Sequence, residues 1–228
     1  MRPKHIKFAA VLASLTMVAS SQAAITTITT DGFNTGAITD NWGATGTTTA
    51  GQWSISVTAL GSDGGGGRTV AGNPFGYGGQ ATPQAGTGQA QFSSGYDTGN
   101  AYSSTLTDTV GHTFNVGDKV AMNFFTAGRV GGTGSITLDV SLVGAATLAF
   151  ASYTPTWNNN AWVEHTTSYV TITTAGTYNV RFATAGGAGD DKTTYLDSVS
   201  YKVDAIPEPS ATLLGGFGIL CLLRRRRA

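Results

Sequence analysis

The chain has 228 residues and equal numbers of basic and acidic side chains, 13 of each. Seven of the basic residues lie within residues 2–7 and 224–227, so residues 24–206 carry six basic and twelve acidic side chains and a charge of about −6. An acidic body without a basic stripe excludes nucleic acid as an expected partner. The single cysteine, Cys221, lies near the end of the sequence, which leaves the body without a thiol for a disulfide, a metal site or a nucleophile.

The first 23 residues have the pattern of a secretory signal peptide. Arg2, Lys4 and Lys7 make the start basic, and residues 8–19 are apolar. Ser21-Gln22-Ala23 then places small residues before a cleavage point. The sequence therefore predicts that the protein is exported.

Residues 24–205 are predicted to form one all-β domain, because they are rich in Thr, Gly, Ser, Val and Tyr. Apolar and polar residues alternate in six runs, at residues 53–57, 120–124, 135–142, 169–173, 178–182 and 195–203. Turns rich in glycine and asparagine separate these runs. Short antiparallel strands at this spacing predict a two-sheet β-sandwich of the jelly-roll type. An early strand at residues 25–30 would lie close to the last one.

Residues 61–95 interrupt the alternation and are rich in glycine, with four consecutive glycines at residues 64–67. Such a stretch buries little apolar area to offset the entropy of ordering it, which favours a long mobile loop. The alternative is a binding loop over one sheet, because glycine lets the backbone approach a ligand closely.

Residues 206–228 form a tail with three parts in a fixed order. Pro207-Glu208-Pro209-Ser210 comes first, residues 211–223 are apolar, and Arg224, Arg225, Arg226 and Arg227 follow. The apolar run would span about 20 Å as a helix, against about 30 Å for the hydrocarbon core of a bilayer. The arginines exclude a buried core helix because they must stay hydrated. The run is therefore predicted to be a short transmembrane helix with its arginines in the cytoplasm and the body outside.

The tail resembles the PEP-CTERM sorting signal. This resemblance implies that an exosortase is a partner, that Pro207-Glu208-Pro209 is its recognition element, and that the tail is cleaved near it. The protein would then reside in the cell envelope, held by the C-terminal helix, or be released to the surface or extracellular matrix. The alternative is an ordinary C-terminal anchor with a chance Pro-Glu-Pro in its linker.

The body resembles galactose-binding-like jelly rolls, a group that includes carbohydrate-binding modules. The residues that carry this resemblance are Asp31-Gly32-Phe33, residues 114–119, residues 175–182 and residues 195–200. The resemblance implies a structural calcium ion, the one cofactor expected, with Asp31 and Asp197 among its ligands. Asn34 stands where the family has an acidic residue, so further oxygens would come from Asp190 or Asp191. Solvated turn carboxylates are the alternative.

Catalysis is not expected, because the sequence lacks a recognisable catalytic constellation. The body has one glutamate, Glu164, and two histidines, His112 and His165. Neighbours on a strand point to opposite faces, which weakens Glu164 and His165 as an acid–base pair. A concanavalin-like glycan hydrolase or lyase is the enzymatic alternative, and it would need a second carboxylate facing Glu164.

Sugar binding needs aromatic faces and planar polar groups, and one segment has both. The candidate residues are Tyr153, Trp157, Asn158, Asn159 and Trp162. The alternative is that these aromatic residues belong to the core. The leading hypothesis is an exported, non-catalytic surface or structural protein, and the second is a module that binds exopolysaccharide.

Overall fold

The computed structural model describes residues 25–29, 33, 39–40, 46–59, 66–71, 83–86, 88–93, 101–131, 133–159, 161–184, 187–188 and 192–206. Residues 25–206 form one compact unit. The predicted signal peptide, the sorting signal and the predicted transmembrane run lie outside the described residues. Within the residues that are described, no helix has the length and apolar character needed to cross a membrane.

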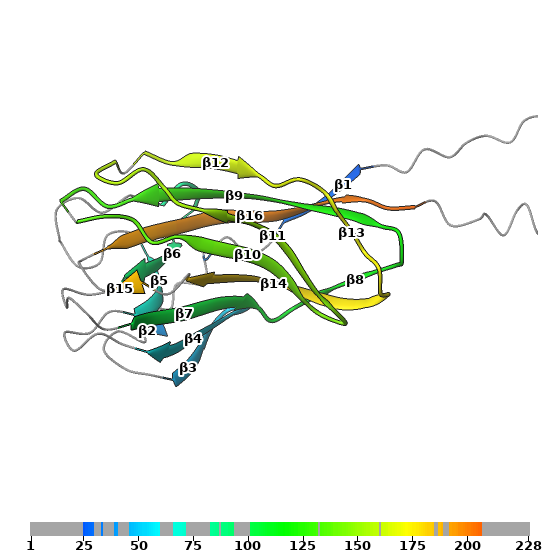
Figure 1. Ribbon diagram of the computed structural model, residues 1–228, viewed down its shortest axis with the longest axis horizontal. Coiled ribbons are helices and arrows are strands. Elements are labelled where there is room, and N and C mark those ends of the chain that lie inside the picture. The colour runs from blue at the N-terminus through cyan, green and yellow to red at the C-terminus, as the bar shows by residue number, and fades with distance from the viewer. Residues whose placement is uncertain are drawn as a thin grey trace, which may run out of the picture. The chain divides into compact units, whose positions relative to one another are not determined.

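The described chain is all-β and forms two antiparallel sheets stacked as a sandwich, as predicted (Figure 1). The strands are β1 (Ile25–Thr29), β2 (Thr39–Asp40), β3 (Gly46–Ala50), β4 (Trp53–Ala59), β5 (Gly66–Ala71), β6 (Gly88–Ser93), β7 (Ala101–Asp108), β8 (His112–Phe114), β9 (Lys119–Gly128), β10 (Leu138–Gly144), β11 (Thr147–Tyr153), β12 (Val163–Thr166), β13 (Val170–Thr171), β14 (Gly176–Thr184), β15 (Gly187–Ala188) and β16 (Thr193–Asp204). The first sheet has the order β12-β9-β16-β6-β5-β2, with β1 beside β16 and β13 beside β9. The second has the order β11-β10-β14-β7-β4-β3, with β15 beside β7 and β8 beside β14.

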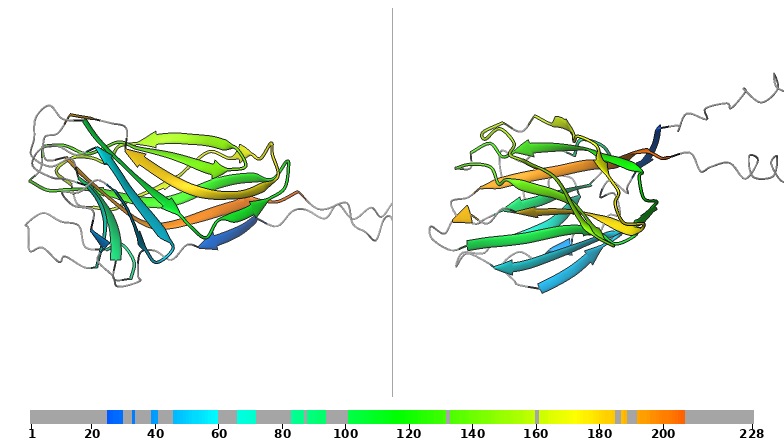
Figure 2. Two further views of the ribbon diagram at one scale, coloured as in Figure 1. Left: turned by 90° about the horizontal axis from the view of Figure 1, so that it is seen from below. Right: turned by 45° about the vertical axis from the view of Figure 1, so that its right-hand side comes forward.

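Three long strands organise the sandwich, and each pairs with two shorter strands along one of its edges (Figure 2). β16 pairs with β6 near its start and with β1 near its end, while β9 runs along its other edge. β14 pairs in the same way with β8 and then β7, and β9 pairs with β13 and then β12. The register brings Ile25 opposite Asp204, which confirms that the early and last strands are adjacent.

The core lies between the sheets and is filled by the apolar side chains of the alternating runs. Trp53 is fully buried, with its ring 4.8 Å from that of Phe33 and 6.5 Å from that of Phe182. In β14 the alternate residues Tyr178, Val180 and Phe182 are buried. Period-two alternation therefore identified the inward face of the strands correctly.

The prediction of a continuous loop at residues 61–95 is wrong in part, because β5 and β6 lie within it. β6 pairs with both β5 and β16, and every residue of β6 is buried. Only Ala90 and Phe92 of β6 belong to the apolar core, which is too short an alternation to stand out in a glycine-rich sequence. Backbone pairing on both edges offsets the ordering entropy that favoured a loop.

Two predicted strands are shorter than their sequence patterns. β10 begins at Leu138 instead of residue 135, because the hydroxyl of Thr194 bonds the N–H and the carbonyl of Ile136 at 2.9 and 2.7 Å in place of a strand partner. β13 covers only Val170–Thr171 of residues 169–173. Beyond it, Ile172 exchanges backbone hydrogen bonds with the turn at Gly117 and Asp118.

Candidate functional site

The predicted carbohydrate-binding segment forms a turn between β11 and β12 that its own asparagines hold in shape. Asn158 has a positive φ of 57°, a conformation that asparagine tolerates better than most residues. Its Oδ1 accepts a hydrogen bond of 3.1 Å from the N–H of Gly131. Asn159 Oδ1 accepts one of 3.0 Å from the N–H of Ala161. Both side-chain oxygens therefore act in the structure of the turn.

The turn is fixed to the end of β9 by a close backbone approach at Gly128. The N–H of Gly128 donates to the carbonyl of Asn159 at 3.1 Å. A Cβ at this position would lie 2.4 Å from the carbonyl oxygen of Thr156, so only glycine fits without displacing the turn. We call residues 156–159 the Trp157 turn.

The three candidate aromatic residues have different surroundings. Trp157 keeps 51% of its surface exposed. Trp162 is half-buried and packs against Ala127 and Tyr195 on the first sheet. Tyr153 is also half-buried, with its ring 5.0 Å from that of Phe124, and burial raises the pKa of its hydroxyl. Of the three, Trp157 is the most exposed, while Trp162 packs on the first sheet and Tyr153 lies against the core.

A row of buried side chains lies on the face of the first sheet that points away from the core. Tyr195 is flanked in register by Gln91 of β6 and Ala127 of β9. Its neighbour Leu196 belongs to the core, so Tyr195 points to the other face. Tyr195 and Gln91 are nevertheless 0% and 3% exposed. Sequence reasoning missed this buried outer row, because the alternation of one strand does not show what covers its second face.

Asp197, one predicted calcium ligand, is a buried carboxylate that holds backbone N–H groups. Its Oδ2 accepts hydrogen bonds from the N–H of Gln84 at 2.8 Å and of Ala85 at 3.2 Å, and its Oδ1 accepts one from Ser198. Burial raises the pKa of Asp197 to about 6, and these hydrogen bonds only partly oppose the effect. Asp197 therefore fastens residues 84–85 to a β-bulge in β16, at which Ser198 has a φ of 52°.

The other predicted calcium ligand, Asp31, lies outside the described residues, as do Asp190 and Asp191. Across the part of the chain that is described, no three His, Cys, Asp or Glu side chains gather closely enough to hold a metal ion. The calcium site stays a prediction.

Glu164 and His165 of β12 have separate partners. Glu164 is exposed and accepts a hydrogen bond of 2.6 Å from the side-chain amide of Asn123. His165 lies against the ring of Phe124, and its Nε2 is 2.7 Å from the hydroxyl of Thr126. Burial lowers the pKa of His165, because it disfavours the charged form of the ring.

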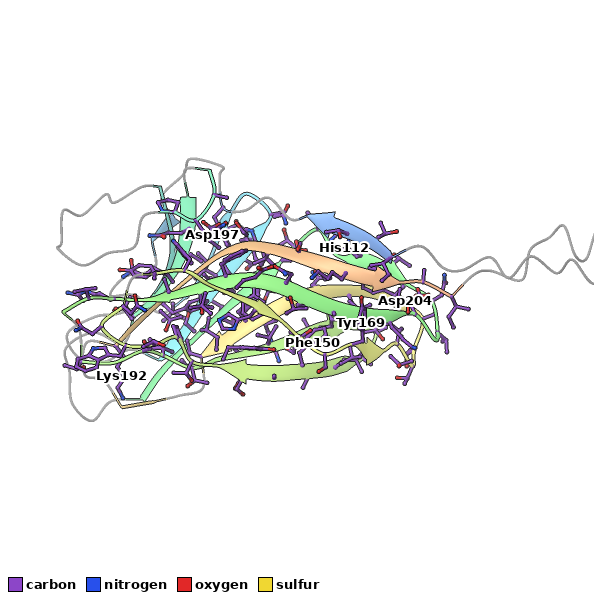
Figure 3. All side chains as sticks on the ribbon, turned by 90° about the horizontal axis from the view of Figure 1, so that it is seen from above. His112, Phe150, Tyr169, Lys192, Asp197 and Asp204 are labelled. Carbon is purple, nitrogen blue, oxygen red and sulfur yellow. The ribbon has the colours of Figure 1, made fainter. Side chains whose placement is uncertain are left out.

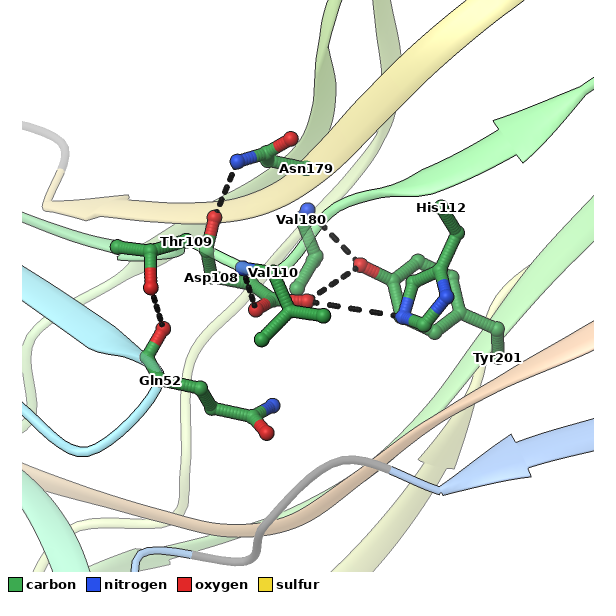
Figure 4. A network of polar contacts seen from close by, with 8 residues as sticks. All are labelled: Gln52, Asp108, Thr109, Val110, His112, Asn179, Val180 and Tyr201. Atoms are coloured by element: carbon green, nitrogen blue, oxygen red, sulfur yellow. Dashed lines mark hydrogen bonds and ion pairs between the residues drawn. The ribbon is translucent and has the colours of Figure 1, made fainter.

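A polar cluster that the sequence did not reveal joins the two sheets inside the sandwich (Figure 4). Asp108 of β7 is fully buried, and the hydroxyl of Tyr201 from β16 donates to it at 3.2 Å. His112 Nε2 lies 3.8 Å from the same carboxylate oxygen. The Tyr201 oxygen also accepts a hydrogen bond of 3.0 Å from the N–H of Val180. Burial, and then the Asp108 charge, raise the pKa of Tyr201, which keeps its hydroxyl a donor.

Neither a protein-family model nor a curated protein matches the sequence. Among solved structures, the chain is similar to the Stig cyclase Fisc from Fischerella sp. TAU, with 11% identity, a TM-score of 0.56, and coverage of 81% of this chain and 100% of that chain. It is also similar to the K2 cleaved adhesin domain of Lys-gingipain, with 14% identity, a TM-score of 0.50, and coverage of 77% and 99%. A third similar structure is TmCBM61 in complex with β-1,4-galactotriose, with 14% identity and coverage of 64% of this chain and 86% of that chain. Its TM-score of 0.43 is too low for any conclusion. Identities this low show a shared β-sandwich fold and assign neither an activity nor a ligand.

Proposed function

We propose that the protein is an exported, non-catalytic β-sandwich that is sorted by its C-terminal tail to the cell envelope or extracellular matrix. The tail pattern of Pro207-Glu208-Pro209, an apolar run and four arginines supports the sorting step. An exosortase would be the sorting partner, and the predicted transmembrane run would hold the chain at the membrane until the tail is processed.

The tail pattern is the observation that carries this proposal, and the register of β9 adds which end of the body lies far from the tail. The first residue of β9, Lys119, lies opposite Asp204 in the strand register, close to where the chain enters and leaves the sandwich. Its last residue, Gly128, donates a backbone hydrogen bond to the Trp157 turn. Ten residues of strand span about 30 Å. Figure 3 likewise shows Lys192 and Asp204 toward opposite ends of the sandwich. A body tethered by its C-terminal end would therefore present the Trp157 turn away from the tether.

Expression with and without an exosortase tests the sorting step. We expect intact mass to show loss of the tail only in the strain with the enzyme, and a Pro207→Ala/Pro209→Ala variant to keep its tail in both. Identical tail retention and location in the two strains would contradict the proposal.

The exposure of Trp157 favours polysaccharide binding as a second candidate function. An exposed indole on a turn fixed by Gly128 is a preformed flat surface for the apolar face of a sugar ring. One such contact gives modest affinity, so binding would depend on several copies acting together.

A glycan array probed with the multivalent protein tests this candidate. Trp157→Ala should abolish the signal, whereas Tyr169→Ala, which removes another exposed aromatic ring, should leave it unchanged. A signal that survives Trp157→Ala would exclude this turn as the platform.

A further inference from the structure

On the face of the second sheet that points away from the core, the strand register aligns two rows of mostly serine and threonine side chains. The rows are Thr49–Ser54–Thr107–Arg181–Ser141 and Thr47–Ser56–Thr105–Ala183–Asp139, each running across β3, β4, β7, β14 and β10. Their strand neighbours Ile55, Leu106 and Phe182 belong to the core, so the rows lie on the outer face. We call these ten residues the hydroxyl face.

Arg181 is the one cation of the hydroxyl face and lies among uncharged neighbours. It is the only Lys or Arg in the strands of the second sheet. Its partners in register are Thr107 and Ser141. In the described part of the chain Arg181 forms no ion pair, and its Nε is buried without a hydrogen-bond partner. A half-buried guanidinium normally has an anion or an acceptor beside it.

The one carboxylate of the face does not supply that anion. Asp139 lies in the other row, with Ala183 as its partner in register. Its Oδ1 accepts a hydrogen bond from the hydroxyl of Ser152 on β11. Among the described residues, no carboxylate therefore pairs with the Arg181 guanidinium, in a body whose charge is about −6.

We propose that the hydroxyl face binds an anionic polysaccharide through Arg181. The planar guanidinium pairs with two oxygens of a carboxylate at once, as a sugar acid offers. The serine and threonine hydroxyls both donate and accept, and so match the hydroxyls of neighbouring sugars. Four inter-strand steps make the face about 19 Å wide, which leaves room for several sugar units. The inference rests on the proposed location at a polysaccharide-containing surface, but it does not require the Trp157 turn.

Two matched polymers test the proposal with the purified protein: polygalacturonate, which carries a carboxylate on each sugar, and its fully methyl-esterified form. We expect binding to polygalacturonate that weakens with added salt, and little binding to the ester. Arg181→Gln should weaken binding about tenfold or more, because it removes a charge-assisted pair. Lys119→Gln, which removes the same charge from the first sheet, should leave binding unchanged.

Further variants separate this site from the Trp157 turn and from a folding defect. Trp157→Ala should retain binding to polygalacturonate, even if it abolishes binding to a neutral glycan. Arg181→Lys keeps the charge but loses the planar guanidinium that can donate to two oxygens at once. Its affinity for polygalacturonate should therefore lie between those of the wild type and Arg181→Gln, while it unfolds at the wild-type temperature. Equal binding by wild type and Arg181→Gln, equal loss in Lys119→Gln, or equal affinity for the ester would each overturn the proposal.

Discussion

Tyr201 of the first sheet donates a hydrogen bond across the interior to Asp108 of the second, with 3.2 Å between Tyr201 Oη and Asp108 Oδ2. The same oxygen accepts from the N–H of Val180, at the point where the pairing of β14 changes from β8 to β7. Tyr201 thus satisfies a backbone donor that lies at a gap between two strands.

Tyr201→Phe should therefore destabilise the protein by about 1–3 kcal/mol, because it leaves the Asp108 carboxylate and the Val180 N–H without this partner in the core. Denaturant unfolding followed by tryptophan fluorescence measures the change. Tyr169→Phe is the matched control, since Tyr169 is 44% exposed and its loss of a hydroxyl should change stability by less than about 0.5 kcal/mol. Equal stability of the two variants would contradict a structural role for the cluster.

Asp197 should make stability fall as pH rises through the mildly acidic range. Its folded pKa of about 6 lies above its ordinary value of 3.8, so the folded state binds a proton more tightly than the unfolded state. The contribution of this group is fully present below about pH 4 and is lost as pH rises to about 6. Thermal unfolding of wild type and Asp197→Asn at half-unit pH steps checks this. The variant should lack the decline, and parallel curves would refute the assignment.

The alternation in the sequence was enough to predict the sandwich and most of its inward-facing residues. It did not locate partners that lie far away in the chain. Asp197 bonds Gln84 and Ala85 more than a hundred residues earlier, and Thr194 ends a strand by bonding Ile136. Such contacts arise only when strands from distant segments meet, so no local pattern records them. The same limit hid β6, which is buried between β5 and β16, two strands from distant parts of the chain.

The candidate site was predictable in its residue types but not in its exposure. The aromatic segment 153–162 did form a turn with asparagines, but Trp157 is exposed whereas Tyr153 is half-buried. This difference arises because β9 and β12 supply the rings against which Tyr153 packs. Arg181 was one of six scattered cations until the strand register placed it among hydroxyls.

Two tryptophan truncations should give very different losses of stability. Trp53→Ala removes a fully buried ring and should destabilise the fold by about 3–5 kcal/mol. Trp157→Ala removes a half-exposed ring from a turn and should cost less than about 1 kcal/mol. Urea unfolding followed by circular dichroism compares the two variants directly. A loss of stability in Trp157→Ala as large as that in Trp53→Ala would show that Trp157 is a core residue and not a platform.

Gly128→Ala should disturb the Trp157 turn without touching Trp157 itself. The added Cβ would lie 2.4 Å from the Thr156 carbonyl and 3.3 Å from that of Asn159, and backbone atoms cannot move aside as a flexible side chain can. We expect a loss of about 1–3 kcal/mol from overpacking, together with weaker glycan-array binding if Trp157 is the platform. Gly134→Ala is the control, because the three atoms nearest to its Cβ would all belong to the flexible Lys192 side chain, at 3.2–3.5 Å. Unfolding curves and array signals that are the same for both variants would mean that the close approach of β9 does not position the turn.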